Sequence, residues 1–244
     1  VTLSLSRGVS GATLYDSFGF ESPTFTLGSL VGQQAWTGSG ASGGLAPQVV
    51  AAPDPVLGQQ AVRLEVPDVQ IAFSTMDHTI PATDPAGQIV TVSFDIYRQE
   101  NSWLSDFWWW WWDTGEPTFG LQWDANVGNP GQTLPNGWNP GASAAATITG
   151  RYANVTMVWD FTQAKAYSWY DGTIIDNGIA ITNITTLTGW KLQLAHDEAA
   201  GSGPEVVWID NFSITAVPEP ASLVLLALGG LAITRRRRSV RQIG

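Results

Sequence analysis

The sequence has no cysteine and only two histidines, His78 and His196. Without cysteine the chain forms no disulfide, no thiolate metal site and no cysteine nucleophile. Neither histidine belongs to a recognisable Ser-His-Asp arrangement of the kind that activates a nucleophile.

Basic residues are scarce before the C-terminus. Five of the eleven lysines and arginines follow Thr234, whereas twenty of the twenty-one acidic residues precede Ala216, which leaves the region before Ala216 with a net charge of about −14. Such a surface repels phosphate backbones, so we expect no nucleic-acid partner. It suits an exported protein that handles neutral ligands or divalent cations.

Helix signals are also few, because glycine, proline, serine and threonine interrupt the chain at short intervals. Between these breaks apolar and polar residues alternate with a period of two, the pattern of half-buried β-strands. Asp171-Gly172 is typical of a type I′ hairpin turn. We expect loops at 38–58 and 126–141. The predicted strands are 61–66, 89–97, 153–161, 166–170, 173–176, 189–195 and 206–214.

The order of these strands resembles the concanavalin A-like, or laminin G-like, jelly roll. The motifs that carry the resemblance are Tyr15-Asp16-Ser17-Phe18, Val92–Ile96, Tyr170-Asp171-Gly172 and Val207–Phe212, the last strand returning beside the first. The resemblance implies an all-β domain over residues 13–216, a two-sheet antiparallel jelly-roll sandwich with one sheet often concave. Many relatives bind ligands or calcium at that face or its rim.

Three blocks follow each other at the C-terminus. Pro218-Glu219-Pro220 precedes an uncharged apolar stretch, 221–234, which as a helix would be about 21 Å long and so short of the roughly 30 Å hydrocarbon core. Four arginines come next, and by the positive-inside rule they hold the C-terminus in the cytoplasm. The expected membrane helix contains Leu223, Val224, Leu225, Leu226, Leu228, Leu231 and Ile233, and the basic cluster is Arg235, Arg236, Arg237 and Arg238.

This order of blocks over residues 217–244 resembles a PEP-CTERM sorting signal. The resemblance implies a Gram-negative exported protein, held transiently in the inner membrane with its body in the periplasm. An exosortase then cuts near Pro218-Glu219-Pro220 and the product reaches the cell surface or the extracellular space. The alternative is an ordinary C-terminal membrane anchor. Residues 1–12 read as the remnant of an export signal that begins upstream of Val1.

A run of tryptophans is the most unusual feature before the tail: Trp108, Trp109, Trp110, Trp111 and Trp112. In a strand their rings alternate between the two faces of the sheet. One set would fill the core, and the other would lie on a surface where flat aromatic rings stack on sugar rings. The alternative is that both sets are buried, since large aromatic side chains also contribute heavily to cores.

Carboxylates give no sign of catalysis. Glucanases of this fold carry two acids on one strand, as Glu-x-Asp-x-x-Glu or a close variant, and that pattern is absent. We therefore predict a non-enzymatic glycan-binding or structural protein of the extracellular polysaccharide or biofilm matrix. The alternative is a glycoside hydrolase with an atypical carboxylate pair. We expect no cofactor; calcium stays an open alternative, with Asp95, Asp124 and Asp210 as oxygen donors but no spacing that defines a cage.

The tail leads to a first prediction. In a host with the matching exosortase, the mature protein should lack Arg235–Arg238, because cleavage near the Pro-Glu-Pro motif removes everything that follows. Intact-mass measurement of the surface protein tests this. A mass that still includes the four arginines would restore the plain anchor.

Overall fold

The computed structural model describes residues 11–69, 72–99, 106–113, 116–124, 129–135, 148–180, 185–196 and 204–218, with backbone alone for 106–113, 116–124, 129–135, Asp176, Ile179 and His196. In these ranges the chain forms antiparallel strands and two 3₁₀ turns, η1 (Phe18–Phe20) and η2 (Gln33–Ala35). None of the helical segments found there has the length and apolar character needed to cross a membrane.

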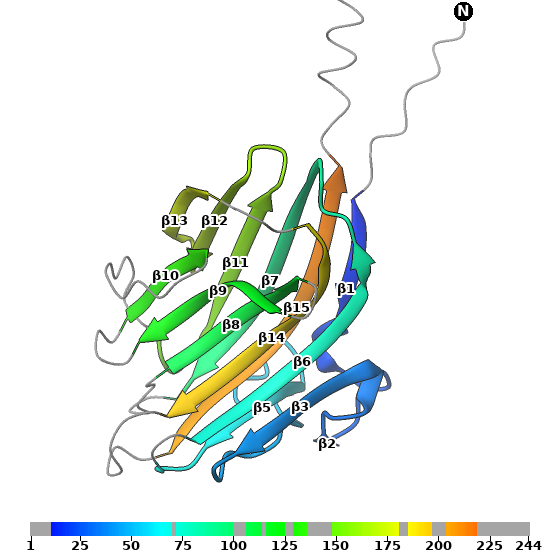
Figure 1. Ribbon diagram of the computed structural model, residues 1–244. Helices are drawn as coiled ribbons and strands as arrows, with labels where there is room; N and C mark the ends of the chain where they lie inside the picture. The colour runs from blue at the N-terminus through cyan, green and yellow to red at the C-terminus, as the bar shows by residue number, and fades with distance from the viewer. Residues whose placement is uncertain are drawn as a thin grey trace, which may run out of the picture.

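The described strands form two stacked sheets (Figure 1). The six-stranded sheet has the order β10-β9-β8-β14-β6-β3 and lies in front in Figure 1. Its strands are β3 (Trp36–Ala41), β6 (Ala72–Thr83), β8 (Asp106–Asp113), β9 (Glu116–Asp124), β10 (Asn129–Pro135) and β14 (Leu187–His196).

The nine-stranded sheet lies behind, in the order β13-β12-β11-β7-β15-β5-β4-β2, with β1 paired to β15. This arrangement confirms the predicted jelly-roll sandwich, including the return of the last strand beside the first. The strands are β1 (Ala12–Asp16), β2 (Gly28–Ser29), β4 (Gln48–Ala51), β5 (Gln60–Val66), β7 (Gln88–Arg98), β11 (Tyr152–Asp160), β12 (Lys165–Tyr170), β13 (Thr173–Ala180) and β15 (Glu205–Pro218).

The predicted hairpin joins β12 to β13. Asp171 and Gly172, at its tip, have φ angles of 48° and 79°. Both are left-handed, which is what a type I′ turn requires and why an aspartate followed by glycine suits it.

The two predicted loops are partly wrong. The segment 38–58 contains the end of β3 and all of β4, and 126–141 contains β10. Gly38 shows the reason, because a Cβ built on it would lie 2.3 Å from the carbonyl oxygen of Thr75 in the neighbouring strand. Here glycine permits a close approach of two backbones within the sheet and does not mark a turn.

Aromatic residues from both sheets meet in the core. Trp36 in β3 and Trp190 in β14 pack edge to face, with ring centroids 4.6 Å apart, and Trp190 stacks on Phe212 of β15 at 3.8 Å. The indole N–H of Trp36 donates a 2.6 Å hydrogen bond to the hydroxyl of Tyr15 in β1. All three packed rings are fully buried. The aromatic cluster therefore joins the two sheets through direct side-chain contacts.

Buried and half-buried residues alternate along strand β14. Trp190, Leu192 and Leu194 are buried, whereas Lys191 and Gln193 between them are half-buried on the outer side of the six-stranded sheet. Because side chains alternate along a strand, the burial of one set assigns the other to the outer face.

The core leads to a prediction about stability. Trp190→Ala should lower the free energy of unfolding by about 3–5 kcal/mol, because it leaves a large cavity between the sheets. Trp169→Ala is the matched control, because Trp169 is half-buried on the outer side of β12. This variant should lower the free energy of unfolding much less. Urea denaturation followed by far-UV circular dichroism measures both. Equal losses for the two variants would contradict the assignment of Trp190 to the core.

Candidate functional site

The tryptophan run lies in β8, between β14 and β9. In the pairing with β14, Trp109 lies opposite Leu192 and Trp111 opposite Trp190. Trp108 lies opposite Gln193 and Trp110 opposite Lys191, while Trp112 lies opposite Gly189. The run therefore alternates against core and outer positions of its neighbour.

Directly opposed residues of an antiparallel pair share one face of the sheet. By this register, positions 109 and 111 belong to rows that enter the core, and positions 108 and 110 belong to outer rows. The alternation left open which set is which, and the register aligns positions 109 and 111 with buried residues of β14 and positions 108 and 110 with half-buried ones. The tryptophan side chains lie outside the described part of the structure, so the sugar platform stays a prediction.

The outer rows continue through β6 and β3 with polar residues. Lys191 lies opposite Asp77, which lies opposite Thr37. Gln193 lies opposite Thr75, which lies opposite Ser39. Two parallel polar rows thus lead across the sheet from the positions of Trp110 and Trp108.

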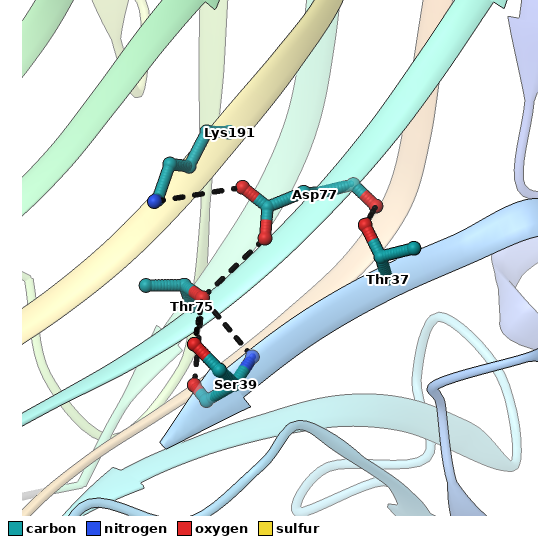
Figure 2. Close-up of polar contacts among 5 residues, drawn as sticks. All are labelled: Thr37, Ser39, Thr75, Asp77 and Lys191. Atoms are coloured by element: carbon teal, nitrogen blue, oxygen red, sulfur yellow. Dashed lines mark hydrogen bonds and ion pairs between the residues drawn. The ribbon is translucent and has the colours of Figure 1, made fainter. Parts of the chain in front are cut away.

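Figure 2 shows the contacts among the side chains of these rows. The Lys191 ammonium lies 3.7 Å from Asp77 Oδ1, and the Thr75 hydroxyl donates to Asp77 Oδ2 at 3.4 Å. The backbone N–H of Ser39 donates to Thr75 Oγ1 at 3.1 Å, and the two hydroxyl oxygens are 3.2 Å apart. Thr37 Oγ1 donates to the carbonyl oxygen of Asp77 at 3.5 Å. The Asp77 carboxylate is therefore held by Lys191 of β14 and by Thr75 of its own strand, while Thr37 of β3 contacts the Asp77 backbone.

Partial burial affects the acidity of Asp77. Its side chain is 25% exposed and that of Lys191 is 22% exposed. Burial raises the pKa of the Asp77 carboxyl above its usual value, while the charge of Lys191 and the hydrogen bond from Thr75 oppose the rise. A fixed carboxylate and ammonium side by side can accept from and donate to the hydroxyl groups of a neutral polyol.

A second feature of this sheet is a pair of acidic residues at opposed positions on two neighbouring strands. Asp106 of β8 lies opposite Asp124 of β9, and on its other side opposite Ala195 of β14. Like charges directly opposite each other weaken a sheet. Acids on separate strands come together only through strand pairing, and no sequence signal reveals which strands pair.

The three predicted calcium ligands do not come together. Asp124 belongs to the six-stranded sheet, whereas Asp95 and Asp210 lie opposite each other in the nine-stranded sheet. Asp95 accepts hydrogen bonds from the side-chain amides of Asn154 and Asn211, both at 2.9 Å. Within the described ranges no group of three or more His, Cys, Asp or Glu side chains is placed to hold a metal ion.

Residues 216–238 match the family model of the PEP-CTERM protein-sorting motif, which confirms the resemblance read from the tail. The protein is therefore an exported protein whose tail directs sorting by an exosortase at the cell envelope. Pro218 is the last residue of β15 and lies opposite Gln88 of β7. Glu219, Pro220, the predicted apolar helix and the four arginines lie outside the described residues.

Solved structures share the fold at low identity. A sialidase matches with a TM-score of 0.56 and 14% identity over 85% of this chain, which spans only 18% of that enzyme's chain. An alginate lyase from Corynebacterium sp. matches with a TM-score of 0.51 and 8% identity, over 69% of this chain and 80% of the lyase. At these identities the likeness establishes the fold alone. Among curated proteins none matches this chain.

The charged pair leads to a prediction about pH. Lys191→Met should lower the free energy of unfolding at pH 7 by about 1 kcal/mol, because it leaves a partly buried carboxylate unpaired. The pKa of Asp77, already raised, should rise further. The native state then binds a proton that the unfolded state has released, so stability falls as pH rises above the unfolded value of about 4.

Urea denaturation at pH 3 and pH 7 measures this effect. At pH 3 the carboxyl is protonated in both states, and the loss should disappear. The double variant Asp77→Asn, Lys191→Met is the control and should show no loss that grows with pH. The same loss at both pH values for the single variant would mean that packing of the lysine stem, and not its charge, matters.

Proposed function

We propose that this exported protein is a non-catalytic glycan-binding module of the extracellular matrix, and that it binds polysaccharide on the outer face of the six-stranded sheet. The observation that carries the proposal is the β8–β14 register, with Trp108 opposite Gln193 and Trp110 opposite Lys191. Two aromatic residues separated by one position, on a row of polar residues, suit successive sugar rings of an extended chain.

The two kinds of residue on this face would divide the work of recognition. Aromatic rings provide flat apolar area at small conformational cost, which matches the apolar face of a sugar ring. Lys191, Asp77 and Gln193 provide donors and acceptors for hydroxyl groups. Side chains already held by neighbours lose less entropy on binding, and Asp77 is held by both Thr75 and Lys191.

The charge of the body favours a neutral glycan. The region before Ala216 carries about fourteen net negative charges. A polyanionic polysaccharide would be repelled at long range, and this repulsion would be screened by salt. A neutral polysaccharide of the matrix encounters no such barrier.

The C-terminal tail would determine how the protein reaches the cell surface. We infer that the apolar stretch 221–234 holds the protein transiently in the inner membrane with its body in the periplasm. Exosortase cleavage then releases the body to the cell surface or the extracellular polysaccharide. The match at residues 216–238 supports this order of events.

A glycoside hydrolase remains the second candidate, and the opposition of Asp106 and Asp124 favours it. Hydrolysis of a glycosidic bond uses two carboxyl groups, about 5–5.5 Å apart in retaining enzymes. Directly opposed residues in an antiparallel pair have Cβ atoms about 4.5–5.5 Å apart, which is compatible with such a pair.

Substitution of the outer tryptophans tests the glycan face. The double variant Trp108→Ala, Trp110→Ala should lose its retention by neutral polysaccharide in affinity electrophoresis while its far-UV circular dichroism stays that of the wild type. Trp169→Ala, on the other sheet, is the control and should be retained like the wild type. Unchanged retention of the double variant, or its unfolding, would contradict a surface role for these rings.

The same polysaccharides distinguish the second candidate. A binding module should release no reducing ends on prolonged incubation. If the wild type does release them, and Asp106→Asn or Asp124→Asn abolishes the release without loss of retention, the protein is a hydrolase.

A further inference from the structure

Strand β15 runs directly into the sorting motif. Its last residue, Pro218, is also the first residue of the motif and lies opposite Gln88 at the start of β7. Only Glu219 and Pro220 separate it from the apolar stretch 221–234. Three residues of fully extended chain span at most about 11 Å. With the apolar stretch in the membrane, the end of β15 therefore lies close to the bilayer, where an exosortase has to reach it.

Both edges of β15 are paired at this end. On one side, positions 213–218 pair with β7. On the other side β1 begins beside the end of β15 (Figure 1), with Ala12 opposite Ala216 and Thr13 opposite Thr215. A partner that binds a chain in extended form pairs with the backbone N–H and C=O groups of a free edge. While both neighbours are in place, positions 213–216 offer no such edge.

The two neighbours differ in how firmly they are held. Val90, Val92 and Phe94 of β7 are fully buried, and β7 also pairs with β11 on its far side. Among the described strands β1 pairs with β15 alone, and its first two residues, Ala12 and Thr13, are exposed. Segments with few buried contacts open locally at low free-energy cost. Strand β1 is therefore the neighbour that can leave without opening the core.

A shift of register divides β1 into two parts. The shift lies between Thr13 and Tyr15. After it, the Tyr15 hydroxyl accepts a 2.6 Å hydrogen bond from the Trp36 indole, and the Tyr15 ring packs on His78 with centroids 4.1 Å apart. The exposed part before the shift can therefore open while the part at Tyr15 stays in place.

We propose that the exosortase docks on the edge of β15 that β1 covers, and that the opening of Ala12 and Thr13 limits the rate of processing. The enzyme takes residues 215–217 as an extended strand in place of β1, immediately before the rest of the motif. The folded body thereby controls access to its own sorting signal. This inference rests on the proposed processing of the tail and does not depend on the glycan face.

A disulfide between the two strands tests the opening. The chain has no cysteine, so Thr13→Cys with Thr215→Cys introduces one possible bridge. Directly opposed residues of an antiparallel pair have Cα atoms about 4.5–5.5 Å apart, a distance that a disulfide spans. In a host with the matching exosortase, the oxidised double variant should be processed about tenfold more slowly than the wild type, because cleavage follows the population of the open state.

Intact-mass measurement at successive times after a pulse of synthesis gives the rate at which the tail is lost. The single variants Thr13→Cys and Thr215→Cys are the matched controls and should be processed like the wild type. Reduction of the bridge should restore the rate of the double variant. Far-UV circular dichroism of the purified double variant checks that it has folded.

A substitution at Gly11 tests the opposite direction and does not depend on the bridged variant. A Cβ on Gly11 would lie 2.7 Å from Val217 Cγ2 and 3.3 Å from the carbonyl oxygen of Ala216. Gly11→Val should therefore push the start of β1 away from β15, and the tail should be lost several times faster. Ala51→Val, at an exposed position of β4, is the control and should leave the rate unchanged.

Equal rates for the wild type, the bridged variant and Gly11→Val would overturn the proposal, because the end of β15 would then be accessible while β1 is paired. If the wild type and Gly11→Val both keep Arg235–Arg238, the processing of the tail is itself wrong and the proposal falls with it. The two failures are thus distinguishable, and neither changes the expected retention by polysaccharide.

Discussion

The contact of Trp36 and Trp190 with Phe212 fixes the face on which the residues of the surrounding strands lie. Trp190 stacks on Phe212 at a centroid distance of 3.8 Å and joins the two sheets at one point. Because side chains alternate strictly, the burial of Trp190 sends Lys191 to the outer face, and the pairing register extends this assignment to β6, β3 and β8. The candidate glycan face is thus a consequence of how the core is packed.

Acidic residues on the two sheets are satisfied in different ways. Asp77 is held by Lys191 and Thr75 on the six-stranded sheet. Asp95 is held by two amides on the nine-stranded sheet. Asp210 differs from both, because one of its buried oxygens has no partner. With six basic residues against twenty acids before Ala216, most acids cannot pair with a cation of the same chain, so side-chain amides and backbone N–H groups take that place.

The strands that could be predicted from the sequence are those in which each face meets a single environment. Strand β7 was predicted almost to its ends because Val90, Val92 and Phe94 alternate with polar residues and all three are buried. Strand β6 was missed because three of its buried positions, Ser74, Thr75 and His78, are polar. Ser74 donates its hydroxyl to the carbonyl oxygen of Leu45, and a ring nitrogen of His78 lies 3.1 Å from the carbonyl oxygen of Gln34. Such partners are distant in sequence and leave no periodic signal.

The candidate sites were predictable to different degrees for the same reason. The tryptophan run is visible in the sequence, but the assignment of its two sets needs the β14 register. The opposition of Asp106 and Asp124 depends wholly on strand pairing. Residue-resolved carbene footprinting with and without a neutral polysaccharide measures directly which tryptophans lie on the surface and which of them the glycan covers. Trp108 and Trp110 should be labelled in the free protein and protected by the glycan, while Trp109 and Trp111 should stay unlabelled throughout. Equal labelling of all four, or no protection by any polysaccharide, would contradict the proposed glycan face.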